Sequence, residues 1–228
     1  MANAERGAQG EASGPRGRKN RVMNLGCTAA ILAGGRARRF GGRNKASLRL
    51  GRAAVLERQL DVLRRVVERT VIIADDAMPF QSYGVPIIPD LAQGAGAIGA
   101  VYTAVQSSSA GQTLVVACDM PFLSAAFLAH LIEAGRDVDI AIPKTAHGYE
   151  PLCATYSRRC AAVLQGQIET KHLKVTDLLA GAHGLTIREL CSDEIDQYGR
   201  DELLFFNINT AEDYARAIDL EAEAAGLG

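Results

Sequence analysis

Glycines and cations follow directly after an apolar run near the amino terminus. Residues 27–32 have the composition and length of a buried strand. Residues 34–45 then contain two glycine pairs, four arginines and a terminal Lys45. Glycine permits positive φ and lets backbone N–H groups approach an anion, while the cations supply charge for phosphate oxygens. The segment therefore predicts a polyphosphate-binding loop at the end of a strand.

Two better-known phosphate loops do not fit this segment. A P-loop ends in Gly-Lys-Ser or Gly-Lys-Thr, and that ending is absent. The dinucleotide fingerprint spaces its three glycines differently. A basic surface turn is the remaining alternative, but such a turn has no need of glycine pairs on both sides of its cations.

Two aspartates follow further apolar runs. Asp119 comes directly after the run at 112–118, and a carboxylate there must be paired, hydrogen-bonded or bound to a metal. Mg²⁺ is the expected partner beside a polyphosphate, because it takes carboxylate and phosphate oxygens. A helix N-cap is the alternative, although Pro121 and Ser124 already serve that turn. For Asp90 a metal ligand, a nucleotide contact and a turn cap all stay open.

Alternating helices and strands must position these groups. Helices are expected at 53–67, 98–107 and 124–134, the last capped by Ser124, and strands at 70–74, 85–90, 112–118 and 138–142. The strand at 85–90 is expected to be short because of its prolines. This rhythm predicts an α/β fold: a three-layer, mostly parallel, Rossmann-like sheet with helices on both faces.

The second half of the chain is less regular. Strands are expected at 152–156 and 185–190, and helices at 158–165, 175–179 and 210–223, with Thr210 as the last N-cap. No linker divides the chain, so 25–228 is predicted to be a single domain. Ligands of an open parallel sheet gather beyond the carboxyl ends of its strands. The glycine–arginine loop, Asp90, Asp119 and the Asn207/Asn209 pair are therefore expected there.

Composition narrows the class of protein. The 228 residues have 48% hydrophobic side chains and a net charge of −1, as in an ordinary globular protein. Near-neutral charge and the lack of tryptophan disfavour nucleic-acid binding. Five scattered cysteines favour a reducing, cytoplasmic location over a disulfide framework. No apolar run is long enough to span a membrane, and residues 1–24 are expected to be a disordered leader without a secretory signal.

At this point the chain resembles a known family, the molybdenum cofactor guanylyltransferases, within the sugar-nucleotide-type nucleotidyltransferases. The resemblance extends from Thr28 to about Ile218. It rests on the segment from Leu32 to Lys45, on strand-terminal Asp90, on Cys118-Asp119-Met120-Pro121, and on the Asn207-Ile208-Asn209-Thr210 segment. The glycine–lysine signature is shared by several nucleotidyltransferases. Its Leu-Ala-Gly-Gly start and the Asn-Ile-Asn-Thr segment favour the guanylyl branch.

The resemblance implies an enzyme that transfers GMP from GTP to molybdenum-molybdopterin and releases pyrophosphate. It implies roles for the matching residues: GTP binding by Leu32, Ala33, Gly34, Gly35, Lys45, Asp90 and Asp119, catalysis by Arg39, Lys45 and Asp119, Mg²⁺ binding by Asp119, and the molybdopterin side for Asn207 and Asn209. Glu150 opens a segment that also resembles the pterin side of that branch. Molybdoenzymes or cofactor-assembly proteins are the implied protein partners.

The chain departs from the family pattern in two places. Asp75-Asp76 stand where the family can place a nucleotide-contacting asparagine. Ala97 replaces a usual proline, and Ala100 a common second glycine. Alternatives to the guanylyltransferase are a molybdopterin cytidylyltransferase, another NTP-dependent nucleotidyltransferase, and a non-catalytic nucleotide-bound carrier for molybdoenzymes. Lys45 and Asp119 argue against the carrier, which has no need of a metal-ready carboxylate.

Overall fold

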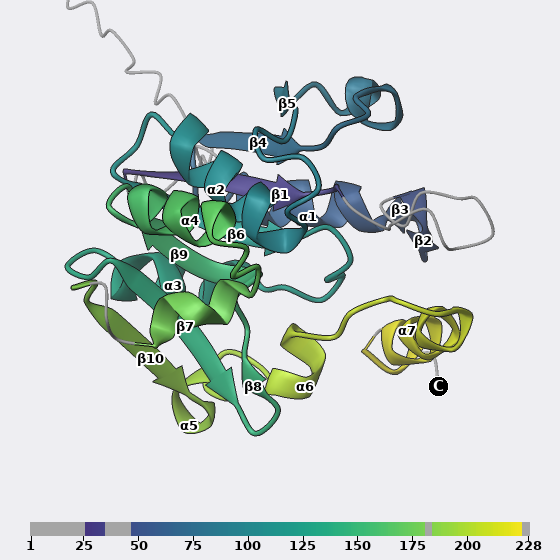
Figure 1. Ribbon diagram of the computed structural model, residues 1–228. Coiled ribbons are helices and arrows are strands. Elements are labelled where there is room, and N and C mark those ends of the chain that lie inside the picture. The colour runs from purple at the N-terminus through teal and green to yellow at the C-terminus, as the bar shows by residue number, and fades with distance from the viewer. Residues whose placement is uncertain (1–25, 35–46, 181–183, 225–228) are drawn as a thin grey trace, which may run out of the picture.

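The computed structural model describes residues 26–34, 47–180 and 184–224. Among these residues, eight strands form one sheet in the order β10-β7-β9-β6-β1-β4-β5, with β8 paired to β7 (Figure 1). The strands are β1 (Cys27–Leu32), β4 (Arg69–Ile73), β5 (Ile87–Ile88), β6 (Gln112–Ala117), β7 (Ile140–Thr145), β8 (Gly148–Tyr149), β9 (Cys153–Ser157) and β10 (Ile187–Cys191). β2 (Arg49–Leu50) and β3 (Ala53–Ala54) form a separate antiparallel pair.

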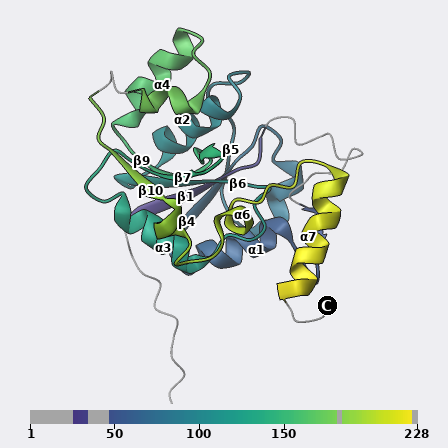
Figure 2. The same cartoon turned by 90° about the horizontal axis from the view of Figure 1, so that it is seen from below.

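Helices cover both faces of the sheet. One face carries α2 (Ala97–Ser107) and α4 (Cys160–Glu169), and the other carries α1 (Val55–Leu63) and α3 (Ala125–Ala134), as the turned view shows (Figure 2). The remaining helical segments are η3 (Met78–Tyr83), η4 (Val175–Leu179), α5 (Ser192–Ile195), α6 (Asp201–Leu204) and α7 (Ala211–Ala224). The three layers are those that the alternating pattern predicts.

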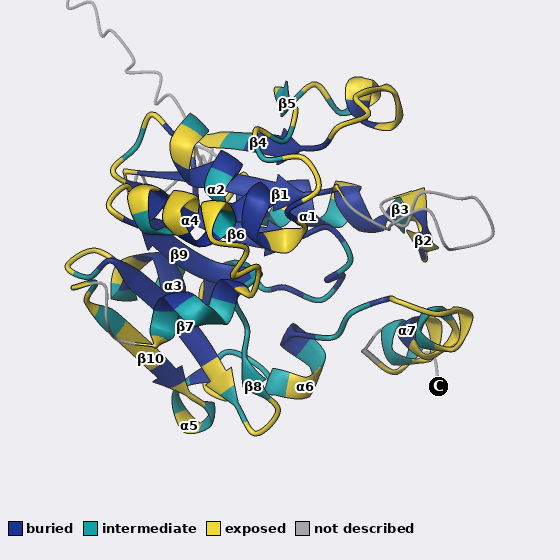
Figure 3. Ribbon diagram, viewed as in Figure 1, coloured by how far each residue is buried: buried dark blue, intermediate teal, exposed yellow. Residues whose placement is uncertain are grey.

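The alternation of side chains along β1 builds the core. Ala29 and Ile31 pack with α1 and α3, whereas Ala30 and Leu32 pack with α2 and α4. Because both faces are covered, β1 and β6 are buried at every position and are apolar almost throughout, as in parallel sheets generally. Figure 3 shows these central strands buried, while exposed positions gather on η3 and on the outer side of α7.

Most predicted elements are confirmed, with shifted ends. The helix expected at 53–67 ends at Leu63, and that expected at 158–165 lies at Cys160–Glu169. The strand at 85–90 shrinks to Ile87–Ile88, because the flanking Pro86 and Pro89 have no N–H to donate. Ser124 caps α3 as predicted, its hydroxyl accepting from the Phe127 N–H at 3.1 Å.

Other features of the fold were not predicted. β9 runs antiparallel to both β6 and β7, so the sheet is mixed, though mostly parallel. The β2–β3 pair is held from the far end of the chain by α7. The Tyr214 hydroxyl donates to the Arg49 carbonyl at 2.7 Å. Glu221 of α7 also pairs with Arg58 of α1. Within the described residues, no helix is both long and apolar enough to cross a bilayer.

Candidate active site

Four parallel strands end in register at one edge of the sheet. Leu32 at the end of β1 pairs with Ile73 of β4 and with Ala117 of β6, and Ile73 pairs with Ile88 of β5. The residues that follow these strands therefore lie in a row. This row holds the predicted groups from Ala33-Gly34, Asp90 and Asp119, so the expectation that they share one edge is confirmed.

The first turn after β1 lies close to the neighbouring strand. The Ala33 N–H donates to the Ile73 carbonyl at 2.9 Å. A Cβ built on Gly34 would lie 3.9 Å from that same oxygen, and Gly34 itself is exposed. The backbone is thus available at the edge where a ligand would approach. Gly35, Arg39 and Lys45 lie outside the described residues, so their predicted roles stay predictions.

Asp90 is fixed by its own turn and by Thr103 in the middle of α2. Its Oδ1 accepts from the Ala92 N–H at 3.0 Å and from the Thr103 hydroxyl at 2.7 Å. The Thr103 oxygen in turn accepts from the Leu91 N–H at 2.9 Å. The Asp90 N–H donates to Asp75 Oδ1 at 3.3 Å. Asp90 therefore does cap a turn, and this local role orients its half-buried carboxylate.

Gly99 makes room for that carboxylate. A Cβ at this position would stand 2.7 Å from the Ala92 carbonyl oxygen and 3.1 Å from Asp90 Oδ2. Gly96, the N-cap of α2, has φ +74°, which disfavours side chains. Gly96 and Gly99 are therefore required where the turn that carries Asp90 meets the start of α2.

Asp119 lies on a turn that a buried glutamine of α1 holds by hydrogen bonds. Gln59 of α1 is 2% exposed, and its Nε2 donates to the Ala117 carbonyl at 2.7 Å and to the Met120 carbonyl at 2.9 Å. These two carbonyls flank Cys118-Asp119. Sequence reasoning missed Gln59, although a polar residue on the apolar face of the predicted helix was a usable signal.

The Asn207–Asn209 segment reaches the same turn from the end of the chain. The Ile208 N–H donates to the Asp119 carbonyl at 3.0 Å. Half-buried Asn207 donates from Nδ2 to the Phe205 carbonyl at 2.9 Å. Asp213 accepts from the N–H groups of Asn209 and Thr210, both at 2.8 Å, while the Thr210 hydroxyl accepts from the Asp213 N–H at 3.1 Å. This reciprocal cap confirms Thr210 as the N-cap of α7, which begins at Ala211.

Asp90 and Asp119 are separated along the edge by β4 and β1. Three interstrand spacings amount to roughly 14 Å, so these carboxylates address different parts of a ligand. Among the described residues, no three His, Cys, Asp or Glu side chains group together as a metal site. Asp119 nonetheless fits Mg²⁺, which is commonly held by one or two carboxylates together with substrate phosphates.

A cavity of about 290 Å³ opens beyond β7 and β8 and is lined by Thr145, His147, Glu150, Asp201, Glu202 and Phe205. Burial raises the pKa of Glu150 to about 7; the charge of His147 opposes this shift and that of Asp201 adds to it. Because β7 is parallel to β6, the cavity lies toward the same edge as Asp119. A carboxyl group that is partly protonated near neutral pH can both donate and accept hydrogen bonds.

Four of the five cysteines are too deeply buried to act as nucleophiles. All five belong to the described residues and are free thiols, and four of them are buried. Burial raises the pKa of Cys27 to about 12 and that of Cys160 to about 11, which keeps both thiols protonated and unreactive.

The chain is similar to a known protein family over most of its length. Residues 29–184 match the model of the MobA-like NTP transferase domain. A curated protein from Desulfosudis oleivorans, named molybdenum cofactor guanylyltransferase, is 31% identical over 191 residues. That alignment covers 83% of this chain and 93% of the relative.

Solved structures show the same fold. Molybdopterin-guanine dinucleotide biosynthesis protein A from Archaeoglobus fulgidus superimposes with a TM-score of 0.73 at 28% identity, covering 86% of this chain and 99% of that one. A protein of Mycobacterium tuberculosis, solved as a complex with manganese, superimposes with a TM-score of 0.61 at 21% identity, covering 85% and 98%.

Proposed function

Because this chain belongs to the family of MobA-like NTP transferases, we propose that it transfers GMP from GTP to molybdenum-molybdopterin. The observation that carries this proposal is the row of strand ends in register, which presents Ala33-Gly34, Asp90 and Asp119 at one edge. The name of the curated relative gives the guanylyl group and the molybdenum cofactor as what it transfers and modifies. The reaction is the one that the sequence resemblance implies.

The transfer exchanges one phosphoanhydride bond for another. A terminal phosphate oxygen of molybdopterin forms a bond to the α-phosphorus of GTP. The bond from that phosphorus to the α,β-bridging oxygen breaks, and pyrophosphate leaves with the electron pair. Such a transfer needs alignment and neutralisation of charge more than covalent help from the protein. The unreactive thiols agree with a direct displacement.

The nucleotide half of the site would lie over β1, β4 and β5. Leu32, Ala33 and Gly34 would contact the base and phosphates, and Asp90 would contact the nucleoside from its fixed position on the α2 turn. Among the residues outside the described ranges, Gly35 would shape the loop. Arg39 and Lys45 would bind the triphosphate and stabilise the departing pyrophosphate.

The acceptor half would lie around β6 and the segment before α7. Asn207 and Asn209 adjoin the Asp119 turn and would face molybdopterin, with Glu150 and its cavity further along the same edge. Asp119 would hold Mg²⁺, and a divalent cation there would neutralise charge on the α- and β-phosphate oxygens. Gln59 keeps the Asp119 turn in place from the core.

The proposal can be tested first by nucleotide binding. In the presence of Mg²⁺, GTP at 100 times its Kd is expected to raise Tm by about 5–10 °C. CTP, ATP and UTP at the same concentration are expected to have much smaller effects. Preference for CTP would point instead to a cytidylyltransferase with the same phosphate chemistry. No response to any nucleotide would contradict the proposed site.

Transfer itself is then measured with GTP labelled at the α-phosphate. Label is expected to move into molybdopterin-guanine dinucleotide, with one pyrophosphate released per transfer. GTP binding without transfer would favour the carrier alternative. A molybdoenzyme that lacks its dinucleotide cofactor, added as the recipient, would show whether a protein partner takes the product.

A further inference from the structure

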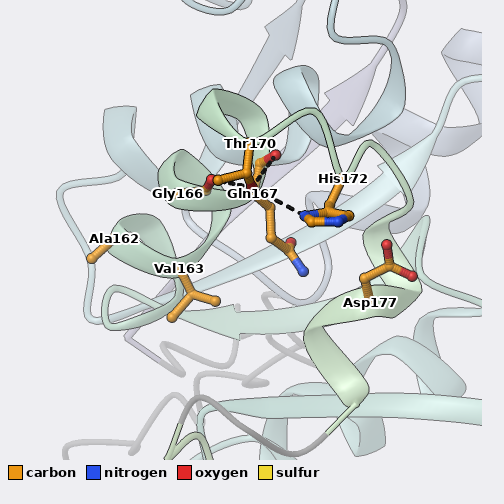
Figure 4. A pocket seen from close by; sticks show the side chains of 7 residues that line it. All are labelled: Ala162, Val163, Gly166, Gln167, Thr170, His172 and Asp177. Carbon is orange, nitrogen blue, oxygen red and sulfur yellow. Dashed lines mark hydrogen bonds between the residues drawn. The ribbon is translucent and has the colours of Figure 1, made fainter.

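Two cavities of the described structure differ in what walls them. The larger, of about 620 Å³, lies against α4 and η4, and no residue of the proposed site lines it (Figure 4). The smaller cavity, beside Glu150, is lined on one side by Asp201, Glu202 and Phe205. These three belong to the 192–206 segment, which contains α5 and α6 and leads directly into Asn207. The position of this segment therefore decides where one wall of the acceptor half lies.

The ends of the 192–206 segment are held by apolar side chains, but its middle is not. Ile195, Leu204 and Phe205 are buried in the core on the α1 and α3 face of the sheet. The structure describes every residue at 196–203, and none of these residues is fully buried. Within that stretch, half-buried Tyr198 packs against the same core. The contacts of Tyr198 therefore bear directly on where the middle of the segment lies.

Two rings of α3 contact the segment. The imidazole of His130 stacks on Tyr198, with ring centroids 4.8 Å apart and planes 22° apart. Phe127 lies 6.3 Å from Tyr198 and 5.5 Å from Phe205, again between ring centroids. Aromatic pairs at such distances stabilise beyond the area that they bury. His130 thus holds the middle of the segment, while Phe127 also holds its end.

A carboxylate fixes the orientation of the His130 ring. Glu194 Oε1 lies 2.6 Å from His130 Nε2 and accepts from Arg188 of β10 at 2.9 Å. Burial alone would raise the pKa of Glu194, but hydrogen bonds from His130 and Arg188 hold this pKa below its ordinary value. The carboxylate is therefore ionised at neutral pH and only accepts, so the imidazole donates from Nε2–H. The ring that stacks on Tyr198 is thereby tied through Glu194 to the sheet.

We propose that His130 is a positioning residue for the acceptor half of the site. It does not line the cavity; it acts through Tyr198, which sets where the cavity wall and Asn207 lie. This inference rests on the proposed function for the identity of the ligand, and on the ring and carboxylate contacts for the position of the wall. Because Ile195 and Leu204 stay buried without His130, its loss is expected to displace the wall and to leave the fold intact.

Hydrogen exchange tests the positioning without any substrate. In the full-length protein, His130→Ala is expected to speed exchange of the amides at 198–206 by roughly 3- to 10-fold. One reporter is the Tyr198 N–H, which donates to the Ile195 carbonyl at 2.9 Å. Unchanged exchange at 198–206 would overturn the proposal, whatever reaction the protein catalyses.

A second variant of the same helix is the matched control for the exchange experiment. Glu133 is exposed on α3 and pairs with Arg136 of the turn that follows the helix. Glu133→Ala also removes an ion-pairing side chain, but it leaves the contacts of the 192–206 segment in place. It is expected to leave exchange at 198–206 and both KM values unchanged. Equal effects of the two alanine variants would refute a specific role of His130.

Steady-state kinetics tests the consequence for the acceptor. His130→Ala is expected to raise the KM for molybdopterin roughly 3- to 10-fold and to leave the KM for GTP unchanged. His130→Phe keeps a ring against Tyr198 and is expected to recover most of this loss. His130→Gln keeps a donor for Glu194 without a ring and is expected to recover little.

A merely structural role of His130 would give a different kinetic result. An equal rise of both KM values, a loss of kcat with both KM values unchanged, or no recovery in His130→Phe would each overturn the proposal. An unmodified protein that transfers no GMP would instead contradict the proposed function. The exchange experiment would then still decide whether His130 positions the wall, so the two failures are distinguishable.

Discussion

The two edges of the sheet each contain a strand-adjacent aspartate, and the two aspartates differ in how deeply they are buried. At the edge where β7 begins, Asp139 is 4% exposed and its carboxylate is enclosed. It accepts from the Ser157 hydroxyl at 2.7 Å, from Arg159 at 2.9 Å, and from the N–H and hydroxyl of Thr186 at 2.9 and 3.1 Å. This carboxylate ties the starts of β7 and β10 to the end of β9.

At the edge where β6 ends, Asp119 is half-buried, and residues of the core hold its turn through main-chain hydrogen bonds. The Gln59 amide and the Ile208 N–H secure the turn through carbonyl groups. The difference teaches that one residue type serves two purposes. An aspartate enclosed by donors stabilises the fold, whereas for the one carried on a fixed turn at the carboxyl edge we propose contact with a ligand.

Asp119→Ala should give the largest difference between an effect on activity and an effect on stability. Loss of the carboxylate that we propose to hold Mg²⁺ is expected to lower kcat for GMP transfer by about 100-fold or more. Tm should change by less than about 3 °C, because the turn is held through backbone groups. Steady-state kinetics and thermal melts check both parts. Near-normal turnover would remove Asp119 from the proposed site.

Asp139→Ala should show the reverse pattern. Its buried donors lose their acceptor, which is expected to cost about 1–3 kcal/mol and to lower Tm by about 3–10 °C. At assay temperatures well below the new Tm, the variant should retain its transfer activity. The neighbouring exposed Asp137→Ala is the matched control and should leave Tm unchanged. Equal melts for the two variants would show that the enclosure of Asp139 adds no stability.

The same carboxylate predicts acid sensitivity. Burial alone would raise the pKa of Asp139, but hydrogen bonds from Thr186 and Ser157 and the charge of Arg159 hold it below its ordinary value of 3.8. Its stabilisation is therefore complete above that value and is lost as pH falls through the lower folded pKa. Asp139→Ala should accordingly flatten the loss of Tm on acidification.

Gly99→Ala tests how closely the carboxyl edge is fitted around Asp90. In a helix this change normally stabilises by about 0.5–1 kcal/mol. Here the new methyl group would strike the Ala92 carbonyl and press on Asp90, so a loss of about 1–3 kcal/mol is expected, with weaker GTP binding. Gly166→Ala in α4 meets open space and should show the normal gain. Chemical denaturation of the two glycine variants measures whether their changes in unfolding free energy have opposite signs.

Gln59→Met tests whether the core positions Asp119. Without the two carbonyl contacts the Asp119 turn is expected to shift, lowering kcat roughly 10-fold and raising the Mg²⁺ concentration needed for half-maximal rate. Exposed Gln106→Met serves as the control. If Tm falls while the Mg²⁺ dependence stays constant, Gln59 has only a packing role.

Glu150→Gln should give the smallest effect, on pH dependence. The pKa of Glu150 is raised to about 7, mainly by burial. The fold therefore favours the protonated form, and stability declines as pH rises from about 4.5 to 7. The amide variant cannot ionise, so its Tm should decline less than that of the unmodified protein over this interval. Identical slopes would show that Glu150 is fully solvated.

Several helices, strands and caps of this protein could be predicted from local sequence. The apolar runs at 27–32 and 112–118, the helical spacing in α1 and the Ser124 and Thr210 caps depend on neighbours within a few residues. For that reason these elements and the α/β class were predictable. Residue type and spacing alone likewise predicted a phosphate-binding site. The prediction used the glycines and cations of 34–45 and the aspartates that follow strands.

Only the tertiary structure decided which of these groups meet. The antiparallel course of β9, the Gln59 contacts with the Asp119 turn and the Ile208 bond to Asp119 join segments far apart in the chain. No local pattern encodes such pairings, because they depend on the order of strands in the sheet. The same order puts two strands, β1 and β4, between the strand ends that carry Asp90 and Asp119, and it encloses Asp139 among hydrogen-bond donors while placing Asp119 at the carboxyl edge.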